Sequence, residues 1–154
     1  MEPERHETHA EKMDRNWNEL LQELRVTQTG VQILSGFLLT LPFQSRFTEL
    51  SPEQTVLYLV ITALSVTATA LLVTPVSAHR MLFRRGEKEA LVESSSRLAQ
   101  AGLAVLALTV VGILALIFSM VLSTRVGIIV GAVALVFFVF FWAVWPFLIR
   151  GKKE

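Results

Sequence analysis

The strongest constraint on the fold of this chain is the length of its uncharged stretches. No Asp, Glu, Lys or Arg occurs in residues 26–45, 54–78, 98–124 and 126–149. About 20 apolar residues in an α-helix span a hydrocarbon core of about 30 Å, and each stretch approaches or exceeds that length. Since 53% of the 154 residues are hydrophobic, the chain is predicted to be an all-α, polytopic membrane protein.

The uncharged stretches predict four transmembrane helices in a single membrane domain over residues 15–150. Disordered, solvated tails are expected at residues 1–14 and 151–154, because these are too polar to bury an apolar face. Charged helical segments precede the first and third spans, so both helices are expected to extend into the cytoplasm. The spans are expected at about residues 26–43, 55–76, 98–122 and 126–149.

Local signals predict how two of these helices begin. Ser51, followed by Pro52 and by Gln54 three residues on, is a typical start of a helix. The link at residues 123–125 is so short that the third and fourth spans must form an antiparallel hairpin. Gly127 and Gly131 lie one turn apart, a spacing that lets two helices approach closely.

The positions of the basic residues predict the orientation. With four spans, the N-terminal tail, the middle loop and the C-terminus share one side of the membrane. That side holds twelve of the fourteen Lys and Arg residues, which leaves Arg46 and Arg125 on the other. Since positive charge accumulates in cytoplasmic loops, both termini are expected in the cytoplasm and the protein in the cell inner membrane.

The first uncharged stretch carries polar side chains on one sector of its helix. At about 100° per residue, Arg25, directly before this stretch, falls in the same sector as Gln28, Thr29, Gln32, Gly36 and Thr40 within it, and together they form a polar stripe. Amides in hydrocarbon are costly unless they meet protein or water, so the stripe is expected on an inward or shared surface.

The stripe and the hydroxyls of the second span suggest a neutral polar path for an ion, because amides and hydroxyls can replace water around an ion without titrating. The candidate residues for this path are Gln28, Gln32, Thr29, Thr62, Ser65 and Thr69. The alternative for the hydroxyls is close helix packing, with hydrogen bonds to their own backbone or to a neighbouring helix.

Charged residues gather at the cytoplasmic boundary. The candidates for a vestibule or gate there are Glu19, Glu23, Arg25, His79 and Arg80. An alternative role for these charged side chains is to hold the middle loop against the first helix. Contact with anionic lipid headgroups is expected for Arg84, Arg85 and Lys88.

The sequence argues against an enzyme. It contains no cysteine, none of the familiar nucleophile, phosphate-binding or dinucleotide-binding motifs, and no Asp after Asp14. His79 is the single histidine beyond the N-terminal tail, so a catalytic triad in its usual form is excluded. We therefore expect no cofactor, no bound metal and no nucleic-acid partner.

Three segments resemble a family of small membrane proteins found mainly in high-GC Gram-positive bacteria. They are NELLQELRVTQTGVQIL at residues 18–34, LPF at residues 41–43 and TPVSAHRMLFRRG at residues 74–86. The resemblance covers roughly residues 14–122 and implies a four-helix inner-membrane protein. That family is catalogued as a domain of unknown function, and its members are often labelled sodium:proton antiporters. The matching candidate positions are Glu19, Glu23, Arg25, Gln28, Gln32, His79 and Arg80.

Proton-coupled carriers commonly place a titratable group inside the membrane, and no expected span contains a carboxylate. We therefore expect an oligomeric channel or transporter for a monovalent cation, or a proton, with the polar stripe lining a path between subunits. The lipid bilayer and further copies of the chain are the expected partners. The alternative is a non-transporting membrane scaffold whose basic cytoplasmic loop binds lipid or a soluble partner.

Overall fold

The structure is a computed structural model, and it describes residues 9–82 and 88–150, with side chains at residues 15–77, 94–146 and 148. Every regular element in these ranges is helical, which confirms the all-α prediction for this part of the chain. The elements are the α-helices α1 (His9–Thr40), α2 (Pro52–Leu82), α3 (Lys88–Val121), α4 (Thr124–Val139) and α5 (Trp145–Arg150), the 3-10 helices η1 (Leu41–Phe43) and η2 (Ser45–Glu49), and the π-helix η3 (Phe140–Val144).

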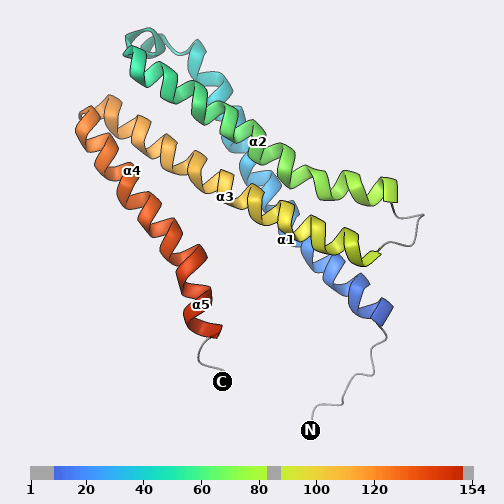
Figure 1. The fold of residues 1–154 in the computed structure, drawn as a ribbon. Coiled ribbons are helices and arrows are strands. Elements are labelled where there is room, and N and C mark those ends of the chain that lie inside the picture. The colour runs from blue at the N-terminus through green and yellow to red at the C-terminus, as the bar shows by residue number, and fades with distance from the viewer. Residues whose placement is uncertain (1–8, 83–87, 151–154) are drawn as a thin grey trace.

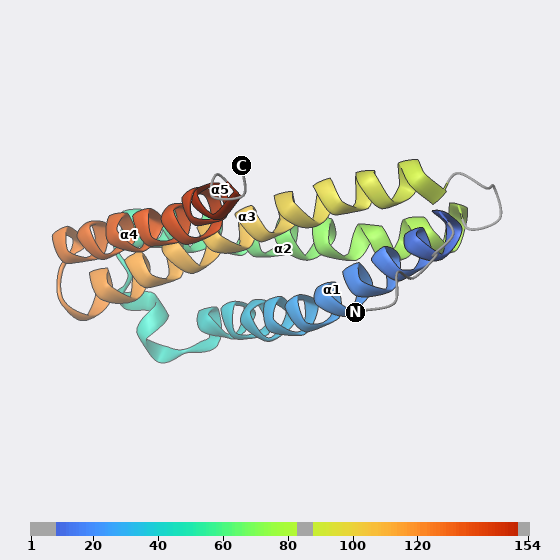
Figure 2. The ribbon, with the colours of Figure 1, turned by 90° about the horizontal axis from the view of Figure 1, so that it is seen from below.

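The long helices alternate in direction. The α1–α2 and α3–α4 links lie at one end of the molecule, and α1 begins and α2 ends at the other (Figure 1). α1 lies on one side of the α2–α3 pair and contacts both helices (Figure 2). α4 packs against α3 but contacts neither α1 nor α2 in the described ranges. The fold is therefore a three-helix unit with α4 attached as an outer hairpin arm.

Within residues 9–82 and 88–150, three helices are long and apolar enough to cross a membrane, which supports the assignment to the membrane class. These candidate spans are Pro52–Ser77, Ser94–Val121 and Thr124–Val144, with mean hydropathies of 2.3, 2.7 and 2.7. α1 is not among them, since it carries charges as far as Arg25 and glutamines at positions 28 and 32.

The buried residues follow a seven-residue repeat. In α1 they are Trp17, Leu24, Val31 and Leu38, each seven positions after the last. In α2 they alternate at intervals of three and four, at Tyr58, Ile61, Ser65, Ala68, Leu72 and Pro75. This is the spacing of helices that pack side by side along a left-handed seam.

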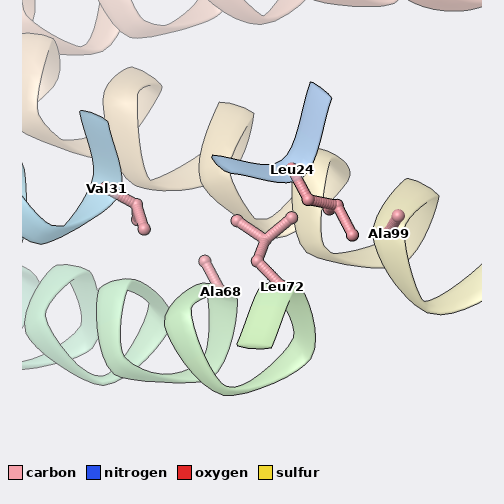
Figure 3. Packing of buried hydrophobic residues seen from close by; sticks show 5 residues of the cluster. All are labelled: Leu24, Val31, Ala68, Leu72 and Ala99. Carbon is pink, nitrogen blue, oxygen red and sulfur yellow. The ribbon is translucent and has the colours of Figure 1, made fainter. Parts of the chain in front are cut away.

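Two clusters of apolar side chains join α1 to both α2 and α3. The first contains Leu24, Val31, Ala68, Leu72 and Ala99, which come from all three helices (Figure 3). The second contains Leu38, Tyr58, Ile61 and Leu116 and lies nearer the α1–α2 link. α1 is therefore fixed against its neighbours at two levels.

The predicted start of α2 is confirmed. The backbone N–H of Ser51 donates to Oε1 of Gln54 at 3.0 Å, and the N–H of Gln54 donates to the Ser51 hydroxyl at 3.3 Å. This reciprocal pair satisfies two donors that the first helical turn leaves unpaired. α1 begins at His9, and α2 continues through Pro75 to Leu82.

Near its C-terminal end, the α4 arm widens into the π-helix η3. Pro146 has no N–H, and its ring would clash with the carbonyl of Trp142 in a regular α-helix. A π-turn relieves such crowding, and the N–H of Trp145 accordingly donates to the carbonyl of Phe140, five residues back. The aromatic rings around this turn are exposed, which agrees with the lipid-facing position typical of such residues near a basic end.

The α3–α4 hairpin depends on two buried glycines of α4. A Cβ at Gly127 would lie 2.5 Å from the carbonyl oxygen of Ala115 and 2.8 Å from Cβ of Ser119. A Cβ at Gly131 would lie 3.1 Å from Cβ of Ala115. The Gly127 and Gly131 spacing therefore acts within one chain, by letting the backbone of α4 approach α3.

Gly127→Ala is expected to lower the free energy of unfolding by about 1–3 kcal/mol, because the backbone of α3 must move to admit the methyl group. The matched control is Gly30→Ala in α1, where a Cβ meets nothing within 4 Å. That variant is expected to gain up to about 1 kcal/mol from helix propensity. Thermal unfolding of both proteins in detergent measures the difference, and equal midpoints would contradict the close approach.

Candidate functional site

Gln28 of the predicted ion path links α1 to α2. Its Nε2 donates to the backbone carbonyl of Leu72 at 2.7 Å, and the side chain is half-buried. Pro75 interrupts the α2 hydrogen-bond ladder at this level, because it offers no N–H to the carbonyl of Leu71. Gln28 thus supplies a donor to the backbone of α2 beside this interruption.

Ser35 and Ser65 form the second link between the two helices. Their hydroxyls are hydrogen-bonded to each other, and Ser35 also donates to the carbonyl of Val31 at 2.8 Å. Since a hydroxyl carries one proton, Ser65 donates to Ser35 in this chain of bonds. Ser65 is 1% exposed, so its hydroxyl depends on Ser35 rather than on water for a hydrogen bond.

Tyr58 forms the third link, and sequence reasoning did not identify it. Its phenol donates to the carbonyl of Leu38 at 3.0 Å in a buried position. The usual donor to that carbonyl is the N–H four residues on, but position 42 is proline. A proline four residues after Leu38 was the signal that this carbonyl needed an outside partner.

We call Gln28, Ser35, Tyr58 and Ser65 the polar seam, since together they join α1 to α2 along their common length. Gln54 adds a link between α2 and α3, with its Nε2 3.3 Å from the Ser119 hydroxyl. In a low-dielectric surrounding such bonds fix helix register, because their loss would leave polar groups unpaired.

The threonines of the predicted path bond to their own helices. Thr62 donates to the carbonyl of Tyr58 at 2.9 Å, and Thr69 donates to that of Ser65 at 2.9 Å. In α1, Thr29 donates to the carbonyl of Arg25 at 3.0 Å. This is the geometry expected of hydroxyls in packed transmembrane helices, and their role along an ion path remains a prediction.

The other members of the predicted stripe lie on the outside of α1. We call them the outer stripe: Arg25, Thr29, Gln32, Gly36 and Thr40, all of which are exposed. The amide of Gln32 makes no hydrogen bond to any residue that the structure describes. The structure therefore separates the two glutamines, with Gln28 at the seam and Gln32 outside.

The predicted vestibule is described only in part. Glu19 and Glu23 are exposed on α1, and Oε1 of Glu19 lies 3.8 Å from Nε of Arg15. His79 and Arg80 belong to α2, but their side chains lie outside the described residues, as does that of Lys88 at the start of α3. The predicted lipid contacts Arg84 and Arg85 lie in the undescribed segment 83–87.

The chemistry of the site is that of neutral amides and hydroxyls. Within the described residues no group of three or more His, Cys, Asp or Glu side chains is placed to hold a metal ion. Amide and hydroxyl oxygens can replace part of the water around a cation, and amide N–H groups can bond to carbonyls. Side chains of this kind can thus solvate a small cation or join helices through hydrogen bonds.

Tyr58→Phe is expected to lower the free energy of unfolding by about 1–3 kcal/mol, because it leaves the buried carbonyl of Leu38 without this donor. Thr67→Val is the control, since the exposed Thr67 hydroxyl bonds to the Ala63 carbonyl of its own helix. The control is expected to change stability by less than about 0.5 kcal/mol. Equal losses in thermal unfolding would contradict a stabilising seam.

Comparison with known proteins gives a family and no function. Neither the curated proteins nor the solved structures contain a match to the chain. Residues 6–146 match a family model that covers all of α1, α2, α3 and α4. The resemblance seen in the sequence was also to a family of unknown function, and the match agrees with it on this point. The chain belongs to the family of unknown function DUF6328.

Proposed function

We propose that α1 is a fourth transmembrane span. Leu38 packs with Tyr58 and Ile61 at one level, and Leu24 and Val31 pack with Ala68 and Leu72 at the other. These α2 residues belong to the candidate span Pro52–Ser77. Because α1 runs beside them along this length, residues 24–38 occupy the same depth in the bilayer.

With four spans, both termini lie on the same side of the membrane. We propose that this side is the cytoplasm and that the membrane is the cell inner membrane. The distribution of Lys and Arg supports this, with twelve of fourteen on the side of the termini.

Gln32 is the observation that carries the proposed function. The middle of the span Pro52–Ser77 falls at Leu64 and Ser65, and Ser65 pairs with Ser35. Gln32 lies three residues before Ser35, about 4.5 Å along the helix axis. An amide left without a partner in an apolar medium costs roughly 2–7 kcal/mol, so the outer stripe needs a wet or protein-covered surface.

That surface is supplied by other copies of the chain. The outer stripe lies outside the three-helix unit, so it cannot line a path within one subunit. An assembly with the stripes facing a common axis would satisfy each Gln32 with water or with another Gln32. The protein is then an oligomeric membrane protein whose outer stripes surround a hydrated path.

The path suits a monovalent cation. Charged residues of the three candidate spans occur close to their ends, at Glu53, Arg97 and Arg125. At the depth of Gln32 the path would offer neutral oxygens that solvate a cation without binding it tightly, a condition for conduction. Such a path would conduct without a proton-exchanging group in its middle.

A second candidate function is a non-transporting scaffold. The observation that favours it is the polar seam, since Gln28, Ser35 and Ser65 are used to join helices of one subunit. In this alternative the outer stripe also joins helices, and the basic middle loop binds lipid or a soluble partner. Cross-linking from the middle loop in native membranes distinguishes the two, because a channel recovers copies of itself.

Gly36→Trp tests whether the outer stripe faces another subunit. A Cβ meets nothing within 4 Å at Gly36 or at Gly30, so both sites accept a ring without a clash inside the subunit. Six residues separate them, which places Gly30 about 120° around the helix from the stripe. Light scattering in detergent is expected to show assembly for the wild type and Gly30→Trp, and smaller particles for Gly36→Trp. A monomeric wild type, or equal particles for both variants, would contradict the shared surface.

Gln32→Leu tests ion passage. Purified wild-type protein in liposomes is expected to pass sodium or potassium ions, and Gln32→Leu is expected to slow the flux about 10- to 100-fold, as loss of a polar contact to a charge would. Thr67→Val, which changes an exposed hydroxyl of α2, should leave the flux unchanged. Absence of flux in the wild type would remove the channel proposal and leave the scaffold.

A further inference from the structure

A large pocket lies at the end of the molecule that holds the α1–α2 link. It has a volume of about 810 Å³, within the range of small-molecule pockets. The pocket lies between the last turns of α1, the link η1–η2 and the last turns of α3. Its floor includes Leu38 and Leu116, which are each 3% exposed and belong to the core. The pocket therefore reaches from the surface to the packed interior.

The part of the pocket farther from the α1–α2 link has an apolar opening between α1 and α3. Phe37, Ile117 and Val121 line this opening and are 69%, 47% and 71% exposed. Ile117 and Val121 belong to the candidate span Ser94–Val121, and Phe37 lies in the segment of α1 that packs beside α2. An apolar opening at this depth admits a hydrocarbon chain from the bilayer and disfavours a water-soluble ligand.

The part of the pocket beside the α1–α2 link is polar. Its rim contains Gln44, Arg46, Glu49 and Gln54. These residues lie in or beside the link between two apolar helices, which is where the membrane meets water. Along the membrane normal the pocket therefore changes from apolar to polar, in the same direction as a lipid changes from acyl chain to headgroup.

The rim presents both signs of charge. Nε of Arg46 lies 4.0 Å from Oε2 of Glu49, and their side chains are 83% and 72% exposed. A pair this long and this exposed is weakly coupled, so each group can take a second partner. A headgroup with a phosphate and an ammonium offers one partner to each. An anionic headgroup would also bring its charge next to Glu49, and an uncharged headgroup would leave Arg46 without a new partner.

We propose that this pocket binds a zwitterionic phospholipid. One acyl chain lies between α1 and α3 over Leu38 and Leu116, the phosphate contacts Arg46, and the ammonium contacts Glu49. The proposal rests on α1 being a transmembrane span, as in the proposed function, but does not depend on ion passage.

Native mass spectrometry of the delipidated full-length protein tests this binding. Phosphatidylethanolamine, phosphatidylglycerol and diacylglycerol are the three probes. We expect one phosphatidylethanolamine per chain, bound at least about tenfold more tightly than either of the others. Arg46→Gln is expected to weaken it about tenfold, through loss of a charge-assisted hydrogen bond to phosphate. Equal binding of all three probes, or no effect of Arg46→Gln, would overturn the proposal.

Ile117→Trp tests the position of the acyl chain, because the ring fills the opening between α1 and α3. We expect this variant to lose the bound lipid while it keeps the thermal unfolding transition of the wild type. Val133→Trp is the control, since Val133 is 65% exposed on α4 and does not line the pocket. A lipid retained by folded Ile117→Trp would overturn the pocket assignment. An Ile117→Trp protein that does not fold leaves the test to Arg46→Gln, which changes an exposed side chain.

The outcome is separable from that of the proposed function. Loss of lipid binding is read by mass, whereas ion passage is read by flux and assembly by light scattering. A protein that assembles and conducts but binds no phosphatidylethanolamine would remove the pocket proposal alone.

Discussion

The packing of α1 depends on one requirement, that polar groups at the depth of the apolar helices find partners. Water satisfies an amide or a carbonyl on a soluble helix, but hydrocarbon does not. The polar seam answers this for Gln28, Ser35 and Ser65 by pairing them across α1 and α2. It also supplies donors where prolines weaken the helical ladder, at the carbonyl of Leu38 and beside Pro75.

Apolar packing arranges the same helices around the seam. Buried side chains recur every seven residues in α1 and at alternating intervals of three and four in α2, so both helices keep one face toward the partner. α4 is held differently, by the bare backbone at Gly127 and Gly131 against α3. This contact is made with α3 alone in the described ranges, so most of the α4 surface is exposed.

The two proposed interaction sites follow from the position of α1. α1 lies on one side of the α2–α3 pair (Figure 2). Its seam residues bond to α2, and its outer stripe is exposed. The same placement opens a pocket between the last turns of α1 and α3, with a polar rim from the link. An amide on the outside and an amphipathic pocket at one end both fit a helix that spans the bilayer.

The sequence by itself determined the elements that depend on local chemistry. Long uncharged stretches required apolar helices, Ser51 and Gln54 fixed the start of α2, and the short link before Gly127 required a hairpin. Periodicity also showed that Gln28 and Gln32 belong to one polar stripe, but that stripe is about 120° wide, which is wider than the face that one helix buries against its neighbour. Only the tertiary structure decided that Gln28 meets α2 and Gln32 does not, because that depends on how α1 is rotated against its neighbours. The role of Tyr58 was settled the same way, since the carbonyl it serves is twenty residues away in the chain.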